Sequence, residues 1–178
     1  MTTIVWVKDK YIAADKRWVW AEKWWSDNQT KIFSLIGDNY NVYLMTSWLT
    51  QMPEKMHQLL DLYFKESFDP TKIYDLQEDL KKTNQWWNFW CLLVCNSFEW
   101  EEDSNKKTRT KSSSRCWKVW QQTVEEADIF YAAYWSWSDF LDGIMAVKPD
   151  MSPEDIFKLV STKDIYTSPT FDLINLSI

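Results

Sequence analysis

Glycine is almost absent from this sequence. Only 2 of its 178 residues are Gly, whereas an average globular chain of this length carries roughly 12, because Gly makes up about 7% of residues. Tryptophan is in excess by a similar amount, with 14 residues. The two totals together are close to the ordinary usage of Gly and Trp combined. The composition is therefore that of a chain in which the two residue types have exchanged places.

Other absences exclude several classes of protein. Cys91, Cys95 and Cys116 are odd in number and show no Cys-x-x-Cys spacing, which argues against a disulfide framework and against a zinc site. We expect reduced, buried thiols instead. No Gly-rich phosphate loop is present, and we predict no cofactor and no metal. The sequence has neither an 18-residue apolar run nor a leader-like N-terminus, which predicts a cytoplasmic protein that does not enter a membrane.

Positive charge is also in short supply. Lys and Arg number 20 against 26 Asp and Glu, which gives a net charge of −6 and a pI near 4.9. A nucleic-acid binder needs clustered Lys and Arg to neutralise phosphates, so the charge argues against nucleic acid as a partner. The length is sufficient for one domain with a sizeable core, and we expect a single domain over residues 1–178.

The order of the expected elements predicts an α+β fold. Residues 3–7 and 11–14 flank a turn and predict a hairpin, and residues 31–35 and 41–46 predict a second strand pair. The other expected elements are helices at 53–68, 138–147 and 152–161, a polar helical or looped stretch at 72–82, and strands at 88–97, 127–134 and 170–176. This order excludes simple βαβ alternation and favours two sheets between helical layers. Residues 101–115 are charged and rich in Ser and Lys, so we expect an exposed hairpin loop without core residues.

The N-terminus carries the residues that suggest chemistry. The chain begins Met1-Thr2-Thr3-Ile4-Val5, and removal of Met1 would leave Thr2 with a hydroxyl beside a free α-amine. The amine can act as the base for the hydroxyl, which is the Thr variant of nucleophilic catalysis. Asp15 and Lys31 would supply an ion pair that tunes this centre, since a buried ammonium requires a partner.

This opening resembles the proteasome β-subunit and HslV-type threonine peptidases. Subunits of that family begin with a Thr-Thr-Ile-Val strand, continue through a Gly-Asp or Ala-Asp step, and carry a Lys before an apolar strand. Residues 134–140, Tyr-Trp-Ser-Trp-Ser-Asp-Phe, are similar to the family's Gly-Ser-Gly-Ser-Asp-Phe segment, and residues 163–168 are similar to its late Asp-x-x-Ser/Thr-Gly element. The resemblance runs from Thr2 to about Leu176.

The resemblance implies a fold and a set of site residues. It implies the four-layer αββα sandwich of the N-terminal nucleophile hydrolases. It also implies that Ser136 and Asp164 support the terminal amine, with Thr167 standing where the family usually has Ser. The implied oxyanion hole is a backbone N–H after the second strand pair, which by register belongs to Ser47 or Trp48.

One departure from the family needs an explanation, because Trp135 and Trp137 stand where the family has Gly. Our hypothesis is that the gene comes from a genome that reads UGA as glycine, translated here with UGA as tryptophan. Seven further Trp lie among polar residues where we expect turns, which favour Gly because it enters φ > 0 without steric cost: Trp18, Trp20, Trp24, Trp25, Trp86, Trp87 and Trp100. The alternative is a protein that is naturally rich in Trp.

The sequence therefore predicts a threonine-type endopeptidase that uses Thr2 after Met1 removal. The resemblance implies a polypeptide substrate, a homo-oligomeric ring that encloses its sites, and an ATP-dependent unfoldase as a possible partner. Two alternatives stay open. The chain could be a catalytically inactive proteasome-like homologue with a structural or binding role, in which Trp135 and Trp137 crowd the site, or another N-terminal nucleophile amidohydrolase.

Overall fold

The computed structural model describes residues 3–20, 24–26, 28–46, 52–83, 89–103, 106–127, 131–134, 138–163 and 167–177, with the backbone alone at 18–20, 24–26, 103, 106, 131–134, 138–140 and 142. The strands are β1 (Ile4–Val7), β2 (Tyr11–Asp15), β3 (Trp18–Trp20), β4 (Trp24–Ser26), β5 (Ile32–Ile36), β6 (Tyr40–Thr46), β7 (Trp90–Asp103), β8 (Lys106–Trp120), β9 (Val124–Glu126), β10 (Tyr131–Tyr134) and β11 (Phe171–Asn175). The helices are α1 (Pro53–Phe64), α2 (Lys72–Thr83), α3 (Ser138–Val147) and α4 (Pro153–Lys163).

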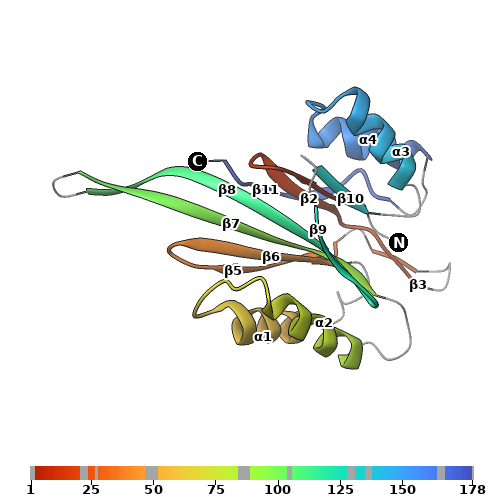
Figure 1. Ribbon diagram of the computed structural model, residues 1–178. Coiled ribbons are helices and arrows are strands. Elements are labelled where there is room, and N and C mark those ends of the chain that lie inside the picture. Colours follow the sequence, from red (N-terminus) through yellow and green to blue (C-terminus); the bar gives the residue numbers. More distant parts are fainter. Residues whose placement is uncertain are drawn as a thin grey trace.

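Two antiparallel sheets lie between two pairs of helices. One sheet has the strand order β10-β1-β2-β11 and the other has the order β5-β6-β7-β8-β9, while β3 and β4 pair separately. Helices α1 and α2 lie on the outer face of the five-stranded sheet, and α3 and α4 lie on the opposite side of the molecule against the four-stranded sheet (Figure 1). The predicted α+β class and αββα layering are confirmed.

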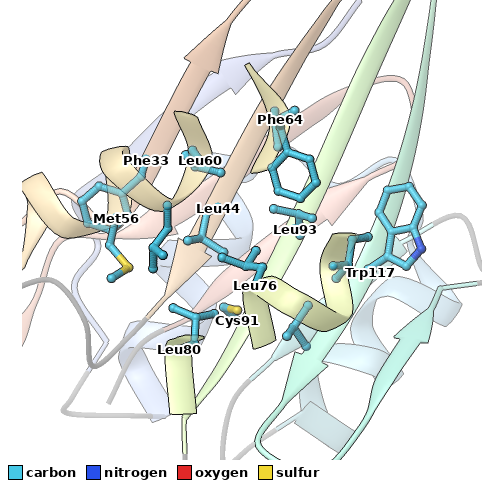
Figure 2. Close-up of a cluster of buried hydrophobic side chains, with 14 of the residues drawn as sticks. Phe33, Leu44, Met56, Leu60, Phe64, Leu76, Leu80, Cys91, Leu93 and Trp117 are labelled. Atoms are coloured by element: carbon cyan, nitrogen blue, oxygen red, sulfur yellow. The ribbon is translucent and has the colours of Figure 1, made fainter. Parts of the chain in front are cut away.

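The largest core cluster fills the space between α1, α2 and the five-stranded sheet. Met56, Leu60 and Phe64 recur at four-residue spacing on α1, so all three face the sheet. They contact a cluster that includes Leu44 and Leu93 from the central strands of that sheet (Figure 2). Each of these five side chains is at most 1% exposed, so this layer is a closed apolar core.

A second cluster fills the space between the two sheets. The side chains of β6 alternate, because successive residues of a strand point to opposite faces. Val42 and Leu44 belong to the cluster beneath the helices, whereas Tyr43 and Met45 belong to the cluster between the sheets. Trp6 of β1 packs into the same inter-sheet layer. This packing brings the two sheets together at the level of the candidate site.

The α3 and α4 side of the molecule has its own core. Phe157 of α4 stacks on Phe171 of β11 with ring centroids 4.6 Å apart. Helix α4 begins as its sequence predicts, since the Ser152 hydroxyl accepts a hydrogen bond from the Asp155 N–H at 3.2 Å and Pro153 occupies the first helical position. The helix packs on the four-stranded sheet, in which strand β11 directly follows residues 167–170.

Several element boundaries differ from the expectation. The first helix is confirmed but ends at Phe64 rather than at residue 68. Pro70 disfavours a helical backbone at Asp69, and residues 65–71 form the connection to α2. The polar stretch at 72–82 is a helix, and it buries a stripe formed by Ile73, Leu76 and Leu80. The short edge strand β9 was not expected from the sequence.

The hairpin expected at residues 101–115 is confirmed, but the extent of its loop is wrong, because most of this stretch belongs to the two strands. Strands β7 and β8 pair along this stretch, and they form a long hairpin that projects beyond the other strands (Figure 1). Ser114 is fully buried, and its N–H donates a hydrogen bond to Asp9 Oδ1 at 2.5 Å. The charged side chains pair across the hairpin, as Lys111 and Glu99 do at 3.2 Å. Cross-strand pairing thus stabilises strands in a stretch whose composition alone indicates a solvated loop.

The turns expected at Trp residues are also wrong where the structure describes them. Strands β3 and β4 contain four of those Trp, and Trp100 lies in β7, in line with the preference of aromatic residues for strands. Among the described non-Gly residues only Asp9 has a positive φ, at 58°. Trp86 and Trp87 lie outside the described residues. No described Trp therefore occupies a backbone conformation that only Gly adopts easily.

The expectation for the cysteines is confirmed. All three are free and buried, and burial raises the pKa of the Cys95 thiol to about 12, which keeps it protonated and unreactive. In the part of the chain that the structure describes, no helix has the length and apolar character needed to span a membrane.

Helix α1 offers a matched pair of substitutions that test the core. We expect Phe64→Ala to lower the free energy of unfolding by about 3–5 kcal/mol, because it opens a cavity at a fully buried position. Leu62→Ala is the control on the same helix, since Leu62 is 67% exposed, and its effect should stay within about 0.5 kcal/mol. Denaturant unfolding followed by circular dichroism measures both, and equal effects would contradict this packing.

Candidate functional site

A buried ion pair joins the two sheets. Asp15 is the last residue of β2, and Lys31 directly precedes β5. Lys31 Nζ lies 3.1 Å from Asp15 Oδ1, and both side chains are 0% exposed. Because a charge removed from water is costly unless it is paired, each of the two residues requires the other. The sequence-based expectation that these residues form a buried pair is met by this geometry.

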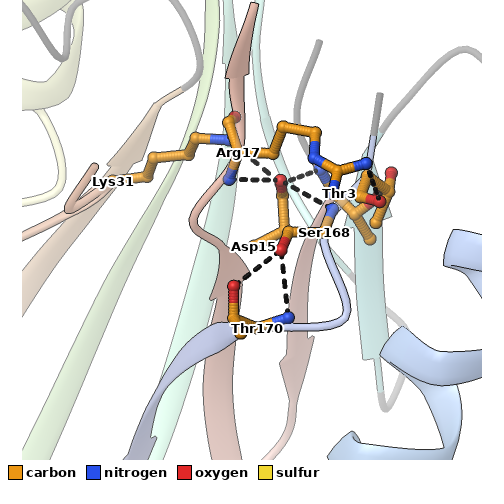
Figure 3. Close-up of polar contacts among 7 residues, drawn as sticks. Thr3, Asp15, Arg17, Lys31, Ser168 and Thr170 are labelled. Atoms are coloured by element: carbon orange, nitrogen blue, oxygen red, sulfur yellow. Dashed lines mark hydrogen bonds and ion pairs between the residues drawn. The ribbon is translucent and has the colours of Figure 1, made fainter. Parts of the chain in front are cut away.

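The Asp15 carboxylate also accepts hydrogen bonds from three backbone N–H groups (Figure 3). Thr3 N–H donates to Oδ1 at 2.6 Å, and the N–H groups of Arg17 and Ser168 donate to Oδ2 at 3.0 and 3.4 Å. Burial raises the pKa of Asp15, while the Lys31 charge and the Thr3 and Arg17 hydrogen bonds oppose that rise. The carboxylate therefore joins β1, the end of β2 and the segment after residue 166.

The Lys31 ammonium is held between two acceptors. In addition to Asp15, it donates a hydrogen bond to the Arg17 carbonyl oxygen at 2.5 Å. The Lys31 carbonyl in turn accepts a hydrogen bond from the Thr46 N–H at 3.1 Å, which places the end of β6 beside the start of β5. This arrangement fixes a positive charge at a fully buried position, where its field is screened little.

The residue next to the predicted nucleophile is tied to the far end of the chain. Thr3 Oγ and Thr167 Oγ lie 2.7 Å apart, with either hydroxyl able to donate. The Arg17 guanidinium donates a hydrogen bond to the Thr167 carbonyl oxygen at 3.3 Å. Thr167, expected as a supporting residue, therefore lies in the same network as Asp15 and Lys31.

The sequence analysis missed three members of this network, namely Thr3, Arg17 and Ser168. Each lies within two positions of a residue that the sequence did point to. Thr3 and Ser168 reach Asp15 through the backbone N–H, and such donors are independent of residue type. The signal that could have found these two N–H groups is therefore the position of Thr3 beside Thr2 and of Ser168 beside Thr167.

The other predicted site residues lie outside the described part of the chain. These are Thr2, Ser47, Trp48, Ser136 and Asp164. Thr3, which follows Thr2, donates to the Asp15 carboxylate, and Thr46, which precedes Ser47, donates to the Lys31 carbonyl oxygen. Within the described stretches no group of His, Cys, Asp or Glu side chains could hold a metal ion.

No protein-family model and no curated protein sequence matches this chain. Solved structures match over almost its whole length. Anbu from Hyphomicrobium sp. strain MC1 has a TM-score of 0.65 and 10% identity, covering 98% of this chain and 81% of that one. Eukaryotic HslV from Trypanosoma brucei has a TM-score of 0.57 and 14% identity, covering 97% and 98%. The chain has the fold of the proteasome-type N-terminal nucleophile hydrolases.

A third protein with this proteasome-type fold was solved with a ligand. The Thiobacillus denitrificans BPH in complex with epoxomicin has a TM-score of 0.55 and 16% identity to this chain, and the match covers 99% of both chains. The resemblance noted in the sequence is therefore confirmed for the fold. At 10–16% identity the likeness shows the fold alone, and the roles of individual residues have to be argued from their own geometry.

The ion pair makes a sharp prediction about stability. We expect Lys31→Met to lower the free energy of unfolding by about 3–5 kcal/mol, because it leaves the buried Asp15 charge without its partner. The double variant Asp15→Asn with Lys31→Met should be less destabilised than Lys31→Met alone, since the uncompensated charge is gone. Denaturant unfolding of the single and double variants checks this, and simple additivity of the two substitutions would contradict it.

Proposed function

We propose that this protein is a threonine-type endopeptidase with Thr2 as the nucleophile after removal of Met1. The observation that carries the proposal is the fully buried Asp15–Lys31 pair, which is hydrogen-bonded to the residue that follows Thr2. A buried ammonium whose partner Asp15 binds the Thr3 N–H suits chemistry at Thr2 that needs an unprotonated amine and a developing alkoxide. The proteasome-type fold supports the same assignment.

The proposed reaction proceeds in two steps. The Thr2 amine takes the proton of the Thr2 hydroxyl while its oxygen bonds to the substrate carbonyl carbon. The amine then gives that proton to the leaving nitrogen as the peptide C–N bond breaks, which leaves an ester on Thr2. A water molecule attacks the ester, its proton returns to the Thr2 oxygen, and the acid product leaves. The Lys31 charge lowers the cost of forming the alkoxide and keeps the amine unprotonated.

The remaining predicted residues have roles in this proposal that follow the family resemblance. Ser136 and Asp164 orient the Thr2 amine, and Thr167 supports them. The oxyanion that develops on the substrate carbonyl is stabilised by a backbone N–H at Ser47 or Trp48. Support for the last assignment is the hydrogen bond from the Thr46 N–H to Lys31, which anchors the end of β6 beside the ion pair.

We further propose that the protein acts on polypeptides within a homo-oligomeric ring in the cytoplasm, with an ATP-dependent unfoldase as a partner, and that residues 1–178 form one peptidase domain. The support for the assembly is the fold alone, because HslV is among the proteins with this architecture. Another N-terminal nucleophile amidohydrolase is the alternative reaction, and the two differ in whether peptide or small amide substrates are cleaved.

The proposal predicts that Thr2→Ala abolishes peptidase activity. We expect a loss of at least about 10³-fold in kcat/KM on a fluorogenic peptide, because the nucleophile is gone. Thr108→Ala is the control, since Thr108 is an exposed threonine on β8, and it should retain full activity. Activity that survives in Thr2→Ala would refute the assignment of the nucleophile.

The activity depends on the residues beside Ser136. We propose that the natural protein carries Gly at 135 and 137, which removes two bulky side chains from the segment that supports the amine. Peptide mass spectrometry of the protein from its native source should show Gly at both positions and Thr2 as the first residue. Trp at both positions with Met1 retained would instead support the inactive homologue, in which the fold persists without its chemistry.

A further inference from the structure

We propose that Thr3 is a positioning residue for the reaction, acting through its hydroxyl. This inference rests on the proposed function, because it concerns the residue that is peptide-bonded to the proposed nucleophile. Thr3 is 1% exposed, so its side chain is closed off from a substrate in solution. Any effect of its hydroxyl on catalysis must therefore pass through the groups that it holds.

The backbone of Thr3 is fixed on both sides. Its N–H donates a hydrogen bond to Asp15 Oδ1 at 2.6 Å, and its carbonyl oxygen accepts one from the Asp15 N–H at 3.0 Å. The Thr2 carbonyl carbon is covalently bonded to the same Thr3 nitrogen. The position of Thr3 therefore limits where the Thr2 amine and hydroxyl can lie relative to the ion pair.

The hydroxyl of Thr3 adds a third anchor, which comes from the opposite end of the chain. It pairs at 2.7 Å with the Thr167 hydroxyl, 164 positions away. Thr167 is 0% exposed, and its carbonyl oxygen accepts a hydrogen bond from the Arg17 guanidinium. A buried hydroxyl is costly to leave unpaired, so this contact holds the segment at 167–170 against β1.

Loss of this anchor should affect the chemical step rather than substrate binding. A displacement of about 1 Å in a reacting group can reduce the rate about 10²-fold. We therefore expect Thr3→Val, which keeps the shape and removes the hydroxyl, to lower kcat by about 10- to 100-fold with little change in KM. Thr3→Ser restores a hydroxyl at the same position, and its kcat should lie within about threefold of the unsubstituted protein.

The experiment measures two rates, that of peptide hydrolysis and that of covalent labelling by epoxomicin, a peptide electrophile. The variants are Thr3→Val, Thr3→Ser, Thr167→Val and the Thr3→Val/Thr167→Val double variant. Thr170→Val is the matched control, because it removes a hydroxyl pair with Ser168 at 2.6 Å on the same segment without touching Thr3 or Thr167. It should stay within about twofold of the unsubstituted protein. Thermal melting of each variant checks that the fold is retained.

The expected result is that Thr3→Val and Thr167→Val both slow the two reactions, and that the double variant is slower than Thr167→Val by much less than the factor by which Thr3→Val alone slows the protein, because the two hydroxyls form one contact. The inference is overturned if Thr3→Val labels at the normal rate, or if the Thr170→Val control slows as much as Thr3→Val. An unsubstituted protein that neither cleaves peptides nor reacts with epoxomicin would overturn the proposed function itself, which separates the two failures.

Discussion

The buried ion pair between Asp15 and Lys31 is the interaction on which the rest of the structure depends. One partner ends a strand of the four-stranded sheet and the other leads into the five-stranded sheet. The pair therefore forms only when the two sheets pack, and packed sheets that lacked one partner would leave a buried charge unpaired. The same contact that fixes the relative position of the sheets also fixes the ammonium that the proposed chemistry uses.

The site gathers segments that are far apart in sequence. Thr3 and Asp15 meet through a local hairpin, but Thr167 arrives from the far end of the chain and joins Thr3 across 164 positions. Such contacts form only after the intervening strands have found their partners, since closing long loops precedes any gain from the contact. The geometry of the site is thus a property of the completed fold. A substitution that weakens the packing of either sheet would also change the positions of the site residues.

How far the sequence predicts this structure depends on whether a feature is marked locally. The β1–β2 hairpin and helix α4 were predictable because each is marked within a few positions, the hairpin by β-branched residues and a turn and the helix by the Ser152 cap. For the β7–β8 hairpin the sequence indicated the turn region but not the length of the strands, because Lys111 gains its partner Glu99 only when the strands pair. Among the site residues, Asp15 and Lys31 were predictable from their side chains and spacing. Thr3 and Ser168 bind Asp15 through backbone N–H groups, which every residue type except Pro carries, so residue type does not predict these two contacts.

The Trp residues that the structure describes differ in whether their side chains fill the core. Trp6 is 1% exposed and donates a hydrogen bond to Ser114 Oγ at 3.2 Å, and Trp117 is 4% exposed and packs on Phe68 with ring centroids 5.2 Å apart. Glycine at either position would open a large cavity in the core, which costs about 3–5 kcal/mol for Trp→Ala changes. Trp100 differs, because it sits at the irregularity in the β7–β8 ladder, where Gly is common. An exchange of Trp for Gly is therefore physically selective: it suits Trp100, and it would destabilise the core at Trp6 and Trp117.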